Sequence, residues 1–247
     1  MTKRFENKVV VITGGSDGIG LATAKLFAIE GAHVYITGRR QELLAEAVKD
    51  IGHGAVGVQG DVTKSADVAR LYERIQREHE QVDVVFANAG IYEGVPLDAI
   101  DDTNFDSTFH VNVKGMVFTV QKALPMMTAG SAIVLNGSVA GSKGLPGQSL
   151  YNASKAAVRS FARSWTNDLK ERGIRVNVVS PGGTETRMIR SYLDAQPEVE
   201  EAFNKSVPLG RLGEPNEVAQ VVLFLASSES SFVAGHELFV DGGFGAV

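Results

Sequence analysis

The hydrophobic positions of the chain form short, β-branched runs that alternate with longer segments in which apolar and polar residues mix. Most of the short runs, such as VVVI and AIVL, are apolar on both faces, which is typical of buried parallel strands. Seven strands are predicted, at Val9–Thr13, His33–Thr37, Ala55–Gln59, Val82–Ala87, Ala132–Asn136, Ile174–Ser180 and Glu237–Val240.

The longer segments predict amphipathic helices between these strands. One is expected at Ile19–Glu30, and its apolar face is expected to comprise Ile19, Ala22, Leu26 and Ile29. Another begins with Pro215 at its first position, and a third covers Leu150 to about Arg172. This alternation over residues 1–247 predicts a single α/β domain, a Rossmann-like doubly wound parallel sheet of about seven strands with helices on both faces.

Composition excludes several classes of protein. With 44% hydrophobic and 21% charged residues among 247, the chain is not disordered, and its net charge of −5 argues against nucleic-acid binding. The absence of cysteine excludes disulfides, thiolate nucleophiles and cysteine-ligated metals, and the scattered histidines predict no metal site. No apolar run is long enough for a signal peptide or a membrane span, so we expect a cytoplasmic protein with no membrane partner.

In sheets of this kind, ligands bind beyond the carboxyl ends of the strands. The first predicted strand is followed by Gly14-Gly-Ser-Asp-Gly18-Ile-Gly20 and then by a helix. Such glycines let a pyrophosphate approach the backbone, and the N–H groups at the helix start can bind it. The spacing differs from the common G-x-G-x-x-G pattern, and a tight strand–helix turn without a ligand is the alternative.

The end of the second predicted strand indicates which dinucleotide binds. NAD-binding proteins usually place an acidic residue about 20 positions after the glycines. Here no acid occurs between Glu30 and Glu42, and Arg39 and Arg40 stand there instead. Their charge suits a 2′-phosphate and favours NADP(H) over NAD(H), although the carboxylate of Asp17 could oppose that phosphate. The alternative is a pair of solvated arginines at a helix start.

Tyr151 and Lys155 are four positions apart in a predicted helix and therefore share one of its faces. An ammonium about 5 Å from a phenol, at an effective dielectric near 20, would lower the pKa of the phenol by some two units. The tyrosine could then exchange a proton with a carbonyl or alcohol oxygen. An ordinary pair, with Tyr151 in the core and Lys155 in water, is the alternative.

Together these motifs resemble the short-chain dehydrogenase/reductase family from Lys8 to Gly243, especially its carbonyl reductase and 3-oxoacyl-carrier-protein reductase branch. The motifs that carry the resemblance are the glycine loop, Asn88-Ala89-Gly90, Asn112 in VNVKG, Ser138 in NGSVAG, Tyr151-x-x-x-Lys155 and Pro181-Gly182. The chain departs from the family pattern at Ala87, where asparagine is frequent, and at Thr184, where an apolar residue is frequent. We expect neither departure to affect the chemistry.

The resemblance implies hydride transfer between NADP(H) and a small carbonyl or secondary-alcohol substrate, with Tyr151 as general acid and base. It implies that Ser138 hydrogen-bonds the substrate oxygen, that Lys155 lowers the pKa of the tyrosine and that Asn112 holds a water in a proton relay. A homotetramer and a substrate lid at about 187–208 are also implied. From the motifs and the resemblance, the residues expected to bind the cofactor are Gly14, Ser16, Asp17, Gly18, Ile19, Gly20, Arg39, Arg40, Asp61, Val62, Asn88, Ala89, Gly90, Tyr151, Lys155, Pro181, Gly182, Thr184 and Thr186.

Two other functions stay open. A carrier-protein-linked 3-oxoacyl reductase would need a basic docking patch, yet Pro125–Gly130 holds no Lys or Arg. Lys170, Arg172 and Arg175 lie further on, where they equally suit a solvated helix end. A non-catalytic dinucleotide-sensing protein would typically have lost a catalytic residue, whereas this chain keeps all four.

Overall fold

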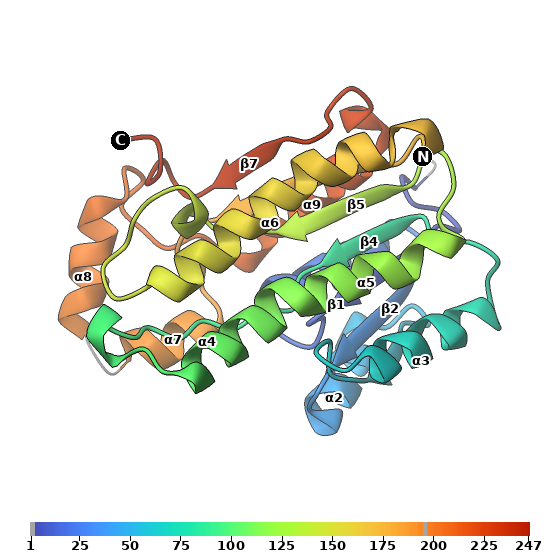
Figure 1. Cartoon of the computed structure of the whole chain (residues 1–247). Coiled ribbons are helices and arrows are strands. Elements are labelled where there is room, and N and C mark those ends of the chain that lie inside the picture. Colours follow the sequence, from blue (N-terminus) through green and yellow to red (C-terminus); the bar gives the residue numbers. More distant parts are fainter. Residues whose placement is uncertain (1–2, 195–196) are drawn as a thin grey trace.

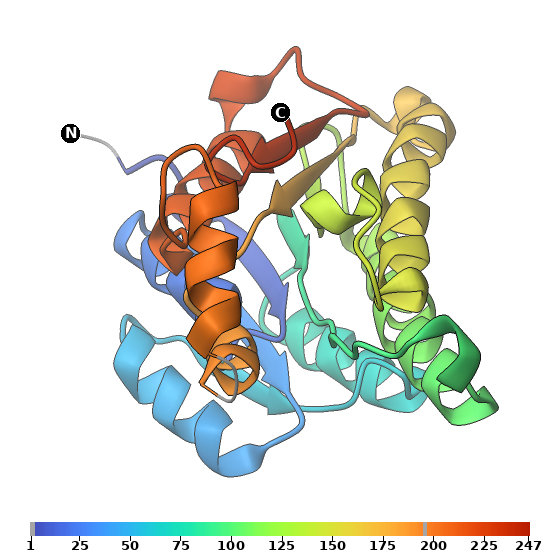
Figure 2. The ribbon, with the colours of Figure 1, turned by 90° about the vertical axis from the view of Figure 1, so that its left-hand side faces the viewer.

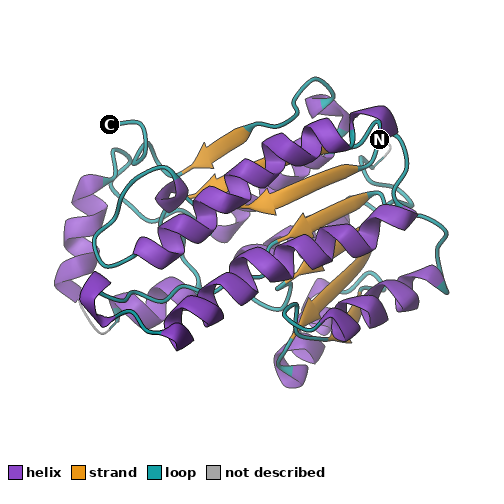
Figure 3. Ribbon diagram, viewed as in Figure 1, coloured by secondary structure: helices purple, strands orange, loops and turns teal. Residues whose placement is uncertain are grey.

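The structure is a computed structural model that describes residues 3–194 and 197–247. Its centre is a seven-stranded parallel sheet with the strand order β3-β2-β1-β4-β5-β6-β7 (Figure 1, Figure 3). The predicted strands are all present, and the bounds of three of them are as expected. The strands are β1 (Val9–Thr13), β2 (His33–Gly38), β3 (Val56–Gln59), β4 (Val84–Ala87), β5 (Ala132–Asn136), β6 (Arg175–Pro181) and β7 (Glu237–Val240).

Helices cover both faces of the sheet, as expected, and each face has its own hydrophobic core. One core is closed by α1 (Gly18–Ile29), α2 (Gln41–Ile51) and α9 (Pro215–Ala226). The other lies under α3 (Ser65–Gln76), α5 (Met116–Ala123) and α6 (Ser149–Asp168), which stand in front of the sheet in Figure 1. Helix α4 (Asp102–Phe109) leads into α5 through one wide helical turn, His110–Gly115.

The predicted apolar face of α1 is partly right: Ile19 and Leu26 pack, partly buried, against the core, but the centre of the buried face lies elsewhere. Ile29 is 57% exposed, whereas Thr23, Ala24, Phe27 and Ala28 are buried. The reason is that α1 packs against the sheet and closely against α9, so its buried side contains small and polar positions as well as apolar ones. The spacing of large apolar residues alone therefore identified only part of the buried face of α1.

The chain order reverses between β1 and β4, because β1 continues to β2 on one side and β4 begins the other half of the sheet. Ligands of doubly wound sheets bind at such a switch point, beyond the carboxyl ends of the strands. Figure 2 looks onto these ends, where α7 (Arg187–Leu193) and α8 (Pro197–Ser206) lie across from α4 and α6. Among the residues described, no helix is long and apolar enough to cross a membrane.

Candidate active site

The turn between β1 and α1 depends on its glycines. Gly14 and Gly18 have φ angles of +65° and +51°, in the left-handed region that favours glycine. A Cβ on Gly20 would lie 2.2 Å from the carbonyl oxygen of Gly14, so the helix starts in direct contact with the loop. This close backbone approach at a helix N-terminus fits the pyrophosphate of a dinucleotide.

Asn88 fastens the ends of three neighbouring strands to one another. Its amide nitrogen donates to the carbonyl oxygens of Thr13 and Gly14, at 2.9 and 3.1 Å, and its side-chain oxygen accepts from Asn136 at 3.0 Å. The Thr13 hydroxyl accepts from the backbone amides of Asn88 and Ala89, each at 3.1 Å. Thr13 and Asn136 were not among the expected site residues, although each is a polar residue at a strand end. These bonds hold the glycine loop beside the end of β5.

Asp17 lies between two arginines from distant parts of the chain. Its carboxylate caps α1 by accepting from the Gly18 amide at 2.8 Å. The other carboxylate oxygen lies 3.1 Å from Nε of Arg187 and 3.9 Å from a guanidinium nitrogen of Arg40. Arg39 and Arg40 are both exposed beyond β2. A phosphate entering here would meet two cations and would compete with Asp17 for them.

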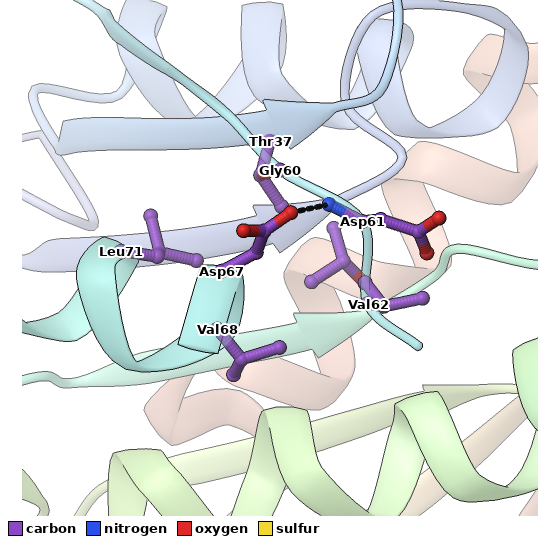
Figure 4. A pocket seen from close by; sticks show the side chains of 8 residues that line it. Thr37, Gly60, Asp61, Val62, Asp67, Val68 and Leu71 are labelled. Carbon is purple, nitrogen blue, oxygen red and sulfur yellow. Dashed lines mark hydrogen bonds between the residues drawn. The ribbon is translucent and has the colours of Figure 1, made fainter. Parts of the chain in front are cut away.

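The segment after β3 is folded around a second aspartate, which sequence analysis missed. Asp67, in the first turn of α3, accepts a hydrogen bond from the backbone amide of Asp61 at 2.9 Å (Figure 4). This bond is the largest of the effects that lower the pKa of Asp67. The Asp61 carboxylate points away from Asp67 and accepts from the amide and hydroxyl of Thr63, at 2.9 and 2.8 Å. The cavity between these residues, about 10 Å³, has room for no more than a water.

Tyr151, Lys155 and Ser138 are brought together by α6 and by the segment after β5. The Lys155 side chain is buried, and its ammonium donates to the carbonyl oxygen of Asn136 at 2.8 Å. It lies 5.7 Å from the centre of the Tyr151 ring. Ser138 lies close enough to the Tyr151 phenol to lower its pKa, and the Ser138 hydroxyl accepts from the amide of Ala140 at 3.2 Å. The reading in which Lys155 extends into water is therefore wrong.

The direction of the Tyr151 pKa differs from the one that the spacing predicts. Burial raises the pKa of Tyr151 above its ordinary value, and the hydrogen bond with Ser138 only partly opposes this. Burial also lowers the pKa of Lys155, to about 8. Desolvation therefore sets the direction of both pKa shifts, whereas the expectation rested on the ammonium–phenolate attraction.

Both polar atoms of the Asn112 side chain are hydrogen-bonded to neighbouring segments. It lies in the wide turn between α4 and α5, where its side-chain oxygen accepts from the amide of Ile91 at 2.8 Å. Its amide nitrogen donates to the carbonyl of Ile91 at 2.9 Å and to the hydroxyl of Ser154 at 3.1 Å. A Cβ on Gly90 would lie 3.3 Å from the Asn112 side-chain oxygen and 3.6 Å from the Lys155 ammonium. The side chain thus holds the segment after β4 against α6. The role of Asn112 in a water-mediated proton relay stays a prediction.

The segment after β6 lies over the glycine loop. Pro181 ends β6, and a Cβ on Gly182 would lie 2.8 Å from the Cα of Asp241, so glycine is required there. The Thr184 hydroxyl donates to the Gly182 carbonyl at 3.2 Å. Thr186 caps α7, and its methyl group lies 2.9 Å from where a Cβ on Gly18 would be. The start of α7 therefore contacts the start of α1.

Three further expected cofactor residues pack against protein. The Ser16 hydroxyl lies 3.0 Å from where a Cβ on Gly38 would be, and Ile19 packs partly buried into the core under α9. Val62 is 9% exposed and packs against Gly115. A ligand can therefore contact Val62 mainly at the backbone atoms of this residue.

The basic residues of the expected lid are engaged in ion pairs. Arg187 pairs with Asp17, and Arg190 forms hydrogen-bonded ion pairs with Glu185 and Glu200. Both arginines thus have acidic partners within the chain, and Arg190 has no free charge for an acidic substrate. Arg187 was missed as a neighbour of the glycine loop, because its contact joins residues 170 positions apart and leaves no local signal in the sequence.

Comparison with known proteins agrees with this arrangement. A family model described as enoyl-(acyl carrier protein) reductase matches residues 14–245. The chain is 46% identical to oxidoreductase asL5 of Sarocladium schorii, over 99% of this chain and 98% of that protein. It is 39% identical to the 3-oxoacyl-[acyl-carrier-protein] reductase FabG of Thermotoga maritima (97% and 98% covered) and 39% identical to cyclopentanol dehydrogenase of Comamonas testosteroni (98% and 99% covered).

The solved structures agree as well. A short-chain dehydrogenase/reductase from Brucella melitensis superimposes with a TM-score of 0.93 at 32% identity, and 99% of each chain is covered. The region that the family model matches, residues 14–245, contains the glycine loop, the strands β2 to β7 and the Ser138, Tyr151 and Lys155 group. The chain belongs to the short-chain dehydrogenase/reductase family of oxidoreductases.

Proposed function

We propose that the protein transfers a hydride between NADP(H) and a small ketone or secondary alcohol, with Tyr151 as general acid and base. The observation that carries this proposal is the buried Lys155 ammonium, 5.7 Å from the centre of the Tyr151 ring on the same face of α6, with Ser138 beside the phenol. This group lies next to the glycine loop, because Asn88 ties the ends of β1, β4 and β5 together.

When bound, the nicotinamide dinucleotide supplies or accepts the hydride. The glycine loop and the start of α1 would hold its pyrophosphate, and Arg39 and Arg40 would hold a 2′-phosphate. Ser138 hydrogen-bonds the substrate oxygen and stabilises its developing charge, while Tyr151 delivers a proton to that oxygen in reduction. Lys155 keeps a positive charge beside the phenol in the range below its pKa of about 8.

The raised pKa of Tyr151 predicts a strong pH asymmetry between the two directions. Reduction needs the protonated phenol, so its kcat/KM should stay flat across the neutral range. Oxidation needs the phenolate, so its kcat/KM should rise about tenfold per pH unit below the pKa of Tyr151. Initial rates with a ketone and with its alcohol, from pH 6 to 10 on the same preparation, check this. A plateau of the oxidation rate below pH 7 would contradict it.

The substrate panel follows from the relatives. The protein should be offered cyclopentanone and cyclohexanone, with their alcohols, because cyclopentanol dehydrogenase is among the similar proteins. Each compound is tested with NADPH and with NADH by following cofactor absorbance. Absence of turnover on every cyclic and linear ketone of such a panel, with bound cofactor verified, would overturn the proposal.

The carrier-linked 3-oxoacyl reductase is the second candidate, because FabG proteins are among the similar proteins. The structure argues against the basic patch that docking of an acidic carrier protein would need, because two of its arginines are hydrogen-bonded within the protein. Arg172 donates to the carbonyls of Leu124 and Met127, at 2.6 and 2.9 Å. Arg175 donates to the carbonyls of Leu225 and Ser227, at and just after the end of α9. Comparing kcat/KM for an acyl-carrier-bound 3-oxo substrate with that for a free 3-oxo ester decides between the two functions.

A lid formed by 187–208 and a homotetramer are parts of the same proposal. Support for the lid is the contact of Thr186 and Arg187 with the glycine loop, which would enclose a dinucleotide. Support for assembly is the exposed Phe239 on β7, the last strand of the sheet. Light scattering that shows a monomer at micromolar concentration would reject the tetramer.

A further inference from the structure

A second tyrosine ring, that of Tyr92, lies against Tyr151, and Tyr92 is not among the expected catalytic or cofactor-binding residues. The two ring centroids are 5.2 Å apart with their planes at 85°, an edge-to-face pair of the kind that aromatic rings prefer. Ser138 reaches Tyr151 from the segment after β5, and Lys155 reaches it from α6. Tyr92, in the segment after β4, is the third neighbour of the Tyr151 ring.

The chain on each side of Tyr92 is anchored. Ile91 exchanges two backbone hydrogen bonds with the side chain of Asn112, at 2.8 and 2.9 Å. Glu93 accepts hydrogen bonds from two side chains of α4, at 3.0 and 3.3 Å. Two positions further on, the Val95 amide donates to the carbonyl oxygen of Gly147 at 2.8 Å. The position of the Tyr92 ring is therefore set by α4, by the wide turn after it and by the segment before α6.

We propose that Tyr92 is a positioning residue for the reaction, whose ring holds the Tyr151 phenol toward Ser138 and excludes water from it on the β4 side. This inference rests on the proposed acid–base role of Tyr151. Among the side chains that the structure describes, the titratable groups that face Tyr151 are Tyr92 and Lys155. Burial is the main cause that raises the pKa of Tyr151, and the nearby Tyr92 phenol raises it further. Removing the Tyr92 ring should therefore lower the pKa of Tyr151.

The test compares Tyr92→Leu, which removes the ring, with Tyr92→Phe, which keeps it. The pKa of Tyr151 is measured by NMR titration of protein with ¹³Cζ-labelled tyrosine, and Tyr151→Phe assigns the signal. Tyr92→Leu should lower that pKa clearly and reduce kcat with cyclopentanone and NADPH about tenfold, with KM changed less than about twofold. Tyr92→Phe should restore kcat and show a smaller pKa shift in the same direction.

Phe5→Leu is the matched control, because Phe5 forms an edge-to-face pair with Phe27, at 4.7 Å and 78°, within the core under α1 and α9. It should lower the melting temperature and leave the pKa of Tyr151 unchanged. The inference is overturned if Tyr92→Leu leaves that pKa unaltered or changes KM alone. Full turnover by Tyr151→Phe would instead refute the proposed function. If cyclopentanone is not reduced, the titration by itself decides the placement of Tyr92.

Discussion

Replacing Tyr151 by phenylalanine should reduce kcat by about 10²–10⁴, which is the usual contribution of a general acid or base. The ring keeps its edge-to-face contact with Tyr92, so the fold around it is preserved and only the hydroxyl beside Ser138 is lost. The phenol is half-buried next to the buried Lys155, and no other described titratable group in contact with it could replace the proton donor except Tyr92 and Lys155. Initial rates with NADPH, and cofactor affinity from NADPH fluorescence, measure the two effects separately.

Tyr72→Phe is the matched control for this variant. Tyr72 is also buried, and its hydroxyl donates to the carbonyl of Thr119 at 2.8 Å, away from the candidate site. Removing that hydroxyl should cost about 1 kcal/mol of stability and leave kcat unchanged. We expect Tyr151→Phe to bind NADPH within about twofold of the parent protein. A Tyr151→Phe protein with parental kcat would show that another group moves the proton.

Replacing both Arg39 and Arg40 by alanine should weaken NADPH binding by about 10- to 100-fold and leave NADH binding nearly unchanged. Each charge-assisted bond to a phosphate contributes up to about 1.5–3 kcal/mol, less where both groups are exposed as these arginines are. The difference between the two cofactors is diagnostic, because they differ only in the 2′-phosphate. Dissociation constants for both, measured at one ionic strength, provide the comparison.

A substitution at Asp17 tests the same cofactor hypothesis with the opposite expected change in NADPH affinity. Asp17→Asn retains a side-chain oxygen to cap α1 and removes the carboxylate that faces Arg40 and Arg187. NADPH should then bind roughly threefold more tightly. Arg77→Ala, at the exposed C-terminal end of α3, is the control for loss of a surface charge. If the double arginine variant discriminates between NADPH and NADH as the parent does, the assignment of the two arginines is wrong.

Local patterns predicted the sheet well, because its central strands β1, β4 and β5 are short apolar runs that are largely buried on both faces. The bounds of β1, β5 and β7 coincide with the apolar runs that predicted them. The proximity of Tyr151 and Lys155 was equally predictable, since helix geometry alone places positions four apart on one face. These features depend on residues close together in the chain.

Features that depend on distant segments were not predictable. The buried face of α1 is set by α9, almost 200 residues further on, and the pairing of Asp17 with Arg187 joins the glycine loop to the first residue of α7. The pKa of Tyr151 is raised because several segments exclude water from it, whereas spacing reveals only its nearest charge. Likewise, the Asn112 motif was visible, but its bonds to Ile91 and Ser154 follow from how α4, α5 and α6 pack.

The hydrogen bonds of Asn88 with Thr13, Gly14 and Asn136 have a consequence for how this protein could acquire new substrates. They join the glycine loop and the ends of β1, β4 and β5 into one hydrogen-bonded unit. On the proposed function, the segments that follow β4, β5 and β6 would form the walls around the substrate. Selection can therefore reshape those walls for a different ketone, one insertion at a time, while the distance that the hydride must travel is preserved.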